Sequence, residues 1–108
     1  MKLYKWQDVA VEQLGGGITR QLITTDNMML SQIFVPGGVA FPAHRMASEQ
    51  MTIFVKGSAT YQSEQSRLEA RAGDIVHIPA GIEHSDRVVE DTIVLDIFSP
   101  PRRDWLKN

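Results

Sequence analysis

Glycine and proline interrupt this chain at such short intervals that long helices have no room to form. The 108 residues include 8 glycines and 5 prolines. The segments between them are short and rich in Ile, Val, Thr, Phe and Tyr, and several alternate apolar with polar residues, as half-buried strands do. They predict strands over residues 18–24, 28–35, 51–55, 58–62, 67–70, 75–78 and 92–98.

Many short strands separated by turns are typical of an all-β sandwich or barrel. The polar segment 62–66 predicts a hairpin loop, and one helical turn over 102–107 is expected because Pro100 and Pro101 precede it. The length suits one domain, and a hydrophobic fraction of 43% is enough for one core. We therefore predict a single all-β domain over residues 1–108, folded as a small β-barrel.

Charge and composition exclude several classes of protein. Eleven basic and thirteen acidic residues give a net charge of −2, so there is no basic excess for binding nucleic acid. No apolar run approaches the ~18 residues that span a bilayer, so no membrane partner is expected. The sequence contains no cysteine, which excludes disulfides, thiolate zinc sites and cysteine nucleophiles. Because the first residues lack the apolar region of a signal peptide, we expect a cytoplasmic protein.

Two of the three histidines, His44 and His84, stand beside predicted turns at the ends of strands. Residue 46 shares a strand face with His44, and Gln50 follows at the start of the next strand. Imidazole nitrogens with an amide or carboxylate oxygen suit a divalent transition metal. From spacing alone, however, two histidines forty residues apart are more simply explained as hydrogen-bonded residues at strand ends.

Two sequence motifs favour a metal site over this simpler explanation. Residues 38–57 read G-x5-H-x-M-x3-Q-x6-G, which resembles the first motif of the cupins, and residues 73–84 read G-x5-P-x-G-x2-H, which resembles the second. The resemblance implies a jelly-roll-like cupin β-barrel. It also implies a divalent metal ion held by His44, Gln50 and His84, with nickel, zinc, manganese and iron all open.

One residue departs from the cupin pattern at a ligand position. The second histidine of the first motif is replaced by Met46. A thioether is a poor ligand for the ions that cupins usually hold. The resemblance therefore implies a metal site that Met46 weakens.

Residues 14–18 (LGGGI) and 95–104 (LDIFSPPRRD) are more specifically similar to the pectin-degradation cupins. Those proteins convert unsaturated uronates, released by pectate or alginate lyases, into linear 5-keto-4-deoxyuronate. The resemblance implies a small carbohydrate acid as ligand, a homodimer, and a pocket lined by Asp96, Phe98 and Arg102. Asp96 and Phe98 share one strand face, and a guanidinium suits a uronate carboxylate. Inside an apolar barrel Asp96 would have a raised pKa and could move a proton, whereas Phe98 is also explained by core packing.

Three functional hypotheses follow. The first is an enzyme that opens unsaturated uronates with the help of a metal. The second is a cupin that binds a sugar or acid without turnover, its metal site degraded by Met46. The third, an oxygenase, is disfavoured because only Glu49 could complete a facial triad, and Glu49 is predicted to point opposite to Gln50.

Overall fold

The computed structural model describes residues 1–106, which form ten strands and two single turns of 3₁₀ helix. The elements in chain order are η1 (Trp6–Asp8), β1 (Glu12–Gly15), β2 (Ile18–Thr24), β3 (Met29–Val35), β4 (Ala40–His44), β5 (Glu49–Lys56), β6 (Ser58–Ser63), β7 (Arg67–Arg71), β8 (Ile75–Ile78), β9 (His84–Val88), β10 (Thr92–Ser99) and η2 (Arg103–Trp105).

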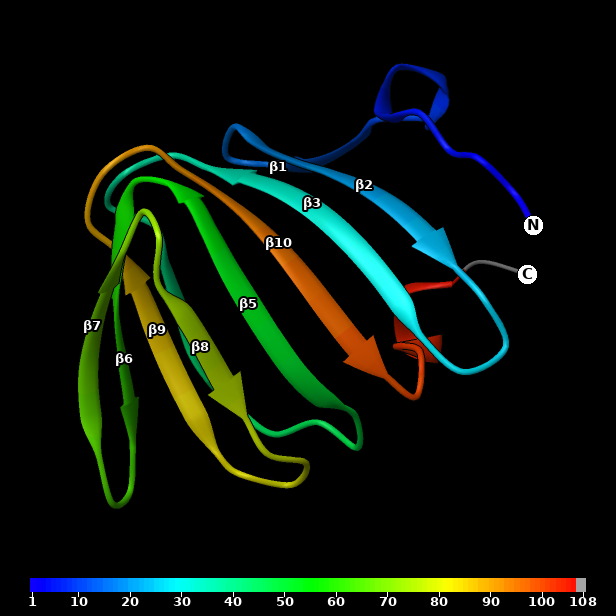
Figure 1. Cartoon of the computed structure of the whole chain (residues 1–108). Helices are drawn as coiled ribbons and strands as arrows, with labels where there is room; N and C mark the ends of the chain where they lie inside the picture. The colour runs from blue at the N-terminus through cyan, green and yellow to red at the C-terminus, as the bar shows by residue number, and fades with distance from the viewer. Residues whose placement is uncertain (107–108) are drawn as a thin grey trace.

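The strands form two antiparallel sheets that face each other (Figure 1). One sheet has six strands in the order β1-β2-β3-β10-β5-β8, and the other has four in the order β4-β9-β6-β7. Strand β10 is inserted between β3 and β5 and pairs with both along nearly its whole length. The prediction of an all-β, jelly-roll-like barrel is confirmed.

The seven predicted strands are present, with bounds within two residues of those expected. Three further strands, β1, β4 and β9, were not predicted. Strand β4 contains Pro42, and its pairing with β9 is irregular between Phe41 and His44. Strand β9 is mostly polar. Neither has the apolar run or clean alternation that identifies a strand in sequence. The predicted turn over 102–107 is η2, and residue 107 lies outside the described residues.

The space between the sheets is filled at one end by apolar side chains. This apolar half of the interior is built on Val35, Phe54, Val76, Val88 and Val94. Toward the other end the same strands carry polar side chains on their inward faces, which is where the candidate site lies. None of the helical turns in residues 1–106 is long and apolar enough to cross a bilayer.

Gly57 makes the tight connection between β5 and β6. Its φ of +90° is one that L side chains rarely adopt, and a Cβ atom there would collide with Thr92. The turn keeps β6 in the four-stranded sheet while β5 stays in the six-stranded one.

Candidate functional site

His44 and His84 lie opposite each other on the paired strands β4 and β9. Their ring centroids are 4.5 Å apart, and the rings are inclined at 53°. In each ring Nδ1 lies 3.2 Å from the backbone carbonyl oxygen two residues earlier, that of Pro42 for His44 and that of Ile82 for His84. Because a carbonyl oxygen only accepts, each Nδ1–H is the donor, and in the neutral ring Nε2 keeps its lone pair.

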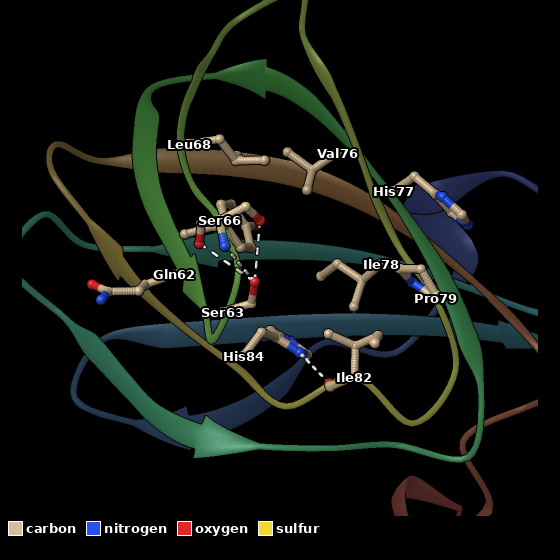
Figure 2. Close-up of a pocket in the computed structure, with 11 residues that line it drawn as sticks. Gln62, Ser63, Ser66, Leu68, Val76, His77, Ile78, Pro79, Ile82 and His84 are labelled. Atoms are coloured by element: carbon tan, nitrogen blue, oxygen red, sulfur yellow. Dashed lines mark hydrogen bonds between the residues drawn. The ribbon is translucent and has the colours of Figure 1, made fainter.

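The two rings are therefore set up as acceptors at Nε2. Burial lowers the pKa of His84, and the charges of His44 and Arg102 lower it further, which favours the neutral ring. Figure 2 shows His84 with its bond to Ile82, beside a small cavity of about 90 Å³ whose apolar walls include Val76 and Ile78. The hydrogen bond from Nδ1 to the Ile82 carbonyl oxygen fixes the orientation of the His84 ring.

Asp96 enters the interior from the opposite sheet, at the centre of β10. Only 5% of its surface is exposed. Its Oδ1 accepts hydrogen bonds from the Thr52 hydroxyl at 2.6 Å and from the Gln50 amide nitrogen at 3.2 Å, and the Ser31 hydroxyl lies 3.5 Å from Oδ2. Burial raises the pKa of Asp96 to about 6, although these three hydrogen bonds and the charge of Arg102 oppose the rise.

Gln50 is oriented by this carboxylate. Its amide nitrogen donates to both Thr52, at 2.7 Å, and Asp96. The amide oxygen Oε1 is consequently the end that is left for a ligand. This orientation is the one required if Gln50 contributes an oxygen to a cation beside His44 and His84.

A cavity of about 140 Å³ joins these groups. It is lined by all six residues singled out in the sequence: His44, Gln50, His84, Asp96, Phe98 and Arg102. Side chains that are far apart in the chain are thus brought to one cavity between the two sheets. Phe98 is 1% exposed and also belongs to the core, so the cavity and packing interpretations of this residue both hold.

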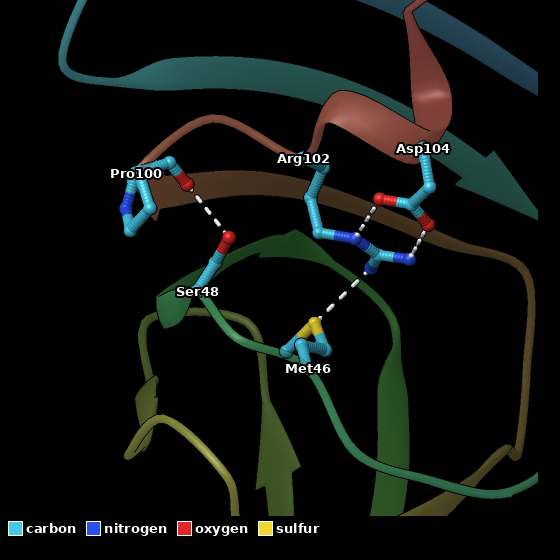
Figure 3. A network of polar contacts seen from close by, with 5 residues as sticks. All are labelled: Met46, Ser48, Pro100, Arg102 and Asp104. Carbon is cyan, nitrogen blue, oxygen red and sulfur yellow. Dashed lines mark hydrogen bonds and ion pairs between the residues drawn. The ribbon is translucent and has the colours of Figure 1, made fainter.

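Arg102 lies where the cavity meets the loops that follow β4 and β10 (Figure 3). Its Nε and Nη2 donate to the two carboxylate oxygens of Asp104 at 3.0 and 2.6 Å. Its Nη1 donates to the sulfur of Met46 at 3.1 Å. The guanidinium carbon also lies 4.3 Å from the centroid of the Trp105 ring and 5.6 Å from that of Phe98. Three kinds of contact thus fix this cation.

Met46 is buried, with 8% of its surface exposed, and packs with Met29 and Phe98. Its sulfur faces the Arg102 guanidinium. The residue that replaces the second histidine of the cupin pattern therefore fills space as an apolar side chain and also accepts a hydrogen bond from a cation.

Two titratable residues of the cavity were missed in the sequence. Asp86 and Tyr61 are cross-strand partners on β9 and β6, and both line the cavity. Burial, followed by the charge of Asp96, raises the pKa of Asp86 to about 7. Burial is also the main reason that the pKa of Tyr61 is raised. Asp86 is two residues after His84, so strand alternation would have found it had β9 been recognised.

Glu49 points to the outer face, where its carboxylate lies 2.6 Å from Nε2 of His77. The predicted opposition of Glu49 and Gln50 is confirmed, so Glu49 does not supply the carboxylate of a facial triad. Within residues 1–106 no group of three or more His, Cys, Asp or Glu side chains is placed to hold a metal ion.

Comparisons with known proteins agree with this architecture. Residues 30–98 match the cupin domain family. The chain is 30% identical over 98 residues to the pectin degradation protein KdgF of Dickeya dadantii, covering 88% of this chain and 89% of that protein. It is 25% identical over 103 residues to the uncharacterized protein SCO3923 of Streptomyces coelicolor, covering 94% of this chain and 98% of the relative.

Solved structures share the fold. KdgF from a Halomonas species superposes with a TM-score of 0.87 at 23% identity, covering 97% of this chain and 100% of that one. An RmlC-like cupin from Shewanella frigidimarina superposes with a TM-score of 0.88, also at 23% identity, covering 98% of this chain and 96% of that one. With its two motifs, opposed antiparallel sheets and matching domain, this chain belongs to the cupin family and is a small cupin similar to KdgF.

Proposed function

We propose that this cupin converts unsaturated uronate monosaccharides into linear 5-keto-4-deoxyuronate. The observation that carries the proposal is the composition of one cavity: a histidine pair, a buried carboxylate and an arginine surround the same space. A uronate has an anionic carboxylate, which the arginine would bind, and a hemiacetal hydroxyl, from which the buried carboxylate could take a proton. Its other hydroxyl groups can hydrogen-bond to the polar side chains of the cavity. The similarity to a pectin degradation protein supports the same substrate class.

A divalent metal would be held by Nε2 of His44, Nε2 of His84 and Oε1 of Gln50. The hydrogen bonds fit this assignment, because both Nδ1 atoms and the Gln50 amide nitrogen are already engaged as donors. The donors are all neutral and only three, so we expect a site of modest affinity for nickel, zinc, manganese or iron. When bound, such an ion acts as a Lewis acid that polarises a substrate oxygen.

Asp96 would move the proton. The carboxylate takes the proton of the hemiacetal hydroxyl at C1, the bond between C1 and the ring oxygen breaks, and C1 becomes an aldehyde. The ring oxygen is left as an enolate oxygen on C5. Return of the proton from Asp96 to C4 turns the enolate into the C5 ketone, so no proton is consumed. Thr52 and Gln50 hold the carboxylate in place during both transfers.

Arg102 would bind the uronate carboxylate. A guanidinium carries five N–H donors, of which three are engaged by Asp104 and Met46. One N–H on each terminal nitrogen is left for the substrate.

The test is turnover of unsaturated galacturonate, produced by a lyase, and of its guluronate-derived counterpart. Loss of the ultraviolet absorbance of the conjugated double bond would be followed with and without each divalent metal, and the product identified by NMR. We expect a rate above the spontaneous one that falls on replacing His84 by Ala. If neither substrate is converted faster than in buffer with any metal supplied, the enzymatic proposal fails.

The alternative is a cupin that binds a carbohydrate acid without turnover. The bond from Arg102 to Met46 favours it, because that bond occupies the side chain at the position of a histidine ligand. Binding of a uronate measured by calorimetry in the absence of any conversion would support this alternative.

We also propose a homodimer, with the reaction taking place in the cytoplasm. The outer face of the six-stranded sheet carries apolar side chains that include Met51, Ile53, Val55 and Ile75. A second copy of the chain would cover this face. Light scattering during size-exclusion chromatography should give a dimer for the parent and a monomer for Val55→Lys combined with Ile75→Lys. A monomeric parent would contradict this assembly.

A further inference from the structure

Arg102 is fixed by two loops that meet beside the cavity. Residues 45–48 follow β4, and residues 100–104 follow β10; together they line an outer groove of about 380 Å³. The Ser48 hydroxyl donates to the carbonyl oxygen of Pro100 at 2.6 Å, which joins the loops (Figure 3). Because Arg102 lines both this groove and the inner cavity, the guanidinium stands at their boundary.

Met46 is held within this arrangement by contacts of both its backbone and its side chain. Its carbonyl oxygen accepts a hydrogen bond from the backbone N–H of Gly81 at 2.8 Å, and its side chain packs against Met29 and Phe98. A sulfur fixed in this way presents its lone pairs in one direction, toward Nη1 of Arg102 at 3.1 Å. The buried methionine thus restrains the guanidinium of Arg102 through this hydrogen bond.

Asp104 alone is a weaker explanation for the placement of Arg102. The Asp104 side chain is 63% exposed, so solvent screens its attraction, and it belongs to a single helical turn at the surface. Met46 contacts the terminal nitrogen on the buried side. Without the Met46 sulfur, Arg102 would keep the exposed Asp104 and the rings of Trp105 and Phe98, but no acceptor would hold Nη1, and the side chain would sample more rotamers before a ligand arrived.

We propose that Met46 is a positioning residue whose sulfur, together with Asp104, holds Arg102 ready for a ligand carboxylate. The inference rests on the proposed function, in which Arg102 binds the uronate carboxylate. It adds a reason for methionine at this position: the side chain that makes a poor metal ligand makes a suitable partner for a guanidinium. Carboxylate binding by Arg102 then needs no metal.

The test compares Met46→Leu with Met29→Leu, because Met29 is a buried methionine of the same cluster but is not the sulfur partner of Arg102 Nη1. Both changes nearly conserve volume, so each is expected to cost less than about 1.5 kcal/mol of stability. The first readout is the nitrogen NMR signal of the Arg102 side chain without ligand. We expect it to broaden or shift to the position of a mobile arginine in Met46→Leu and to stay in place in Met29→Leu.

The second readout is binding of galacturonate, a saturated uronate that is not turned over, in the presence of EDTA. We expect Met46→Leu to weaken binding about fivefold, a loss of the size expected when a rotamer-rich side chain must be ordered on binding. Met29→Leu should bind as the parent does. Met46→Gln, whose amide oxygen accepts at similar reach, should restore both the NMR signal and the affinity.

The two readouts separate the two proposals. An Arg102 signal that is the same in Met46→Leu and Met29→Leu overturns the positioning role, whatever the binding data show. A signal that responds as expected in a protein that does not bind galacturonate supports the positioning role and contradicts the uronate substrate. If Met46→Leu does not fold, the same signal in Met46→Gln decides: a mobile arginine there overturns the inference.

Discussion

The two halves of the barrel interior are built on the same strands but contain opposite chemistry. On β10, inward-facing Val94 belongs to the apolar half, and two residues later Asp96 faces the cavity. On β5, which runs antiparallel to β10, the corresponding residues are Phe54 in the apolar half and Thr52 two residues before it. Thr52 donates a hydrogen bond to Asp96. Burial by itself therefore does not decide what a position does. The apolar half stabilises the fold, and that stability allows the cavity to keep a buried carboxylate that costs free energy.

The largest expected effect is in the apolar half. Replacing Phe54 by Ala should lower the free energy of unfolding by about 3–5 kcal/mol, because it leaves a cavity among tightly packed side chains. Urea unfolding followed by circular dichroism measures the change. Val89→Ala, at an exposed apolar residue, serves as the control and should cost little. A cost below about 1 kcal/mol for Phe54→Ala would mean that this half is not the stabilising one.

Asp96→Asn should lower the activity and leave the fold intact, the reverse of what is expected for Phe54→Ala. The amide keeps the shape of the side chain but cannot take the substrate proton, so the conversion rate should fall by about 100-fold or more while the fold is retained. Rates with unsaturated galacturonate would be compared with those of Asp26→Asn, at an exposed aspartate. Equal rates in the two variants would remove Asp96 from the reaction.

Met46→His tests whether the cavity half becomes a stronger metal site when the missing imidazole is supplied. Methionine and histidine have similar bulk, and a third nitrogen ligand should tighten retention of nickel or zinc by more than about tenfold. Metal content after dialysis against a weak chelator measures this. The gain should be lost when His44→Ala is added. A parent that already retains a full equivalent, with no gain in the variant, would show that Met46 does not weaken the site.

The smallest effect concerns Asp86 and depends on pH. Its pKa is raised from 3.8 to about 7, so the folded protein binds this proton more tightly than the unfolded chain does. The stability cost is therefore absent below about pH 4, grows as pH rises, and is complete above about pH 7. Asp86→Asn should raise Tm by about 4 °C at pH 8, in EDTA, and by much less at pH 5. An equal gain at both pH values would contradict the raised pKa.

The sequence predicted the strands that alternate clearly and the cavity residues that stand on or beside them. Strand periodicity put Asp96 on the same face of its strand as Phe98, and the resemblance to the pectin-degradation cupins implied that this face lines the pocket. His44, Gln50 and His84 needed the resemblance to the cupins, because no periodicity relates residues forty positions apart. Their roles as ligands remain predictions.

The contacts that were not predictable arise where loops meet. Met46 and Arg102 are separated by 56 positions, and their bond depends on how two irregular segments pack. Asp86 was missed because β9 is polar and was not recognised as a strand. In both cases the tertiary fold, not local preference, determines the neighbours of the side chain.

The central position of β10 has a consequence for how the protein folds. This strand is the last of the ten, and it inserts between two strands that are already far back in the chain: Asp96 meets Ser31 across 65 positions and Thr52 across 44. Such long-range pairing is slow, because a large loop must close before any contact compensates for the lost entropy. The barrel and its cavity should consequently form in one late event. In a chain whose β10 has not inserted, the six-stranded sheet is incomplete and Asp96 is not in the cavity. An active but partly folded form is therefore not expected.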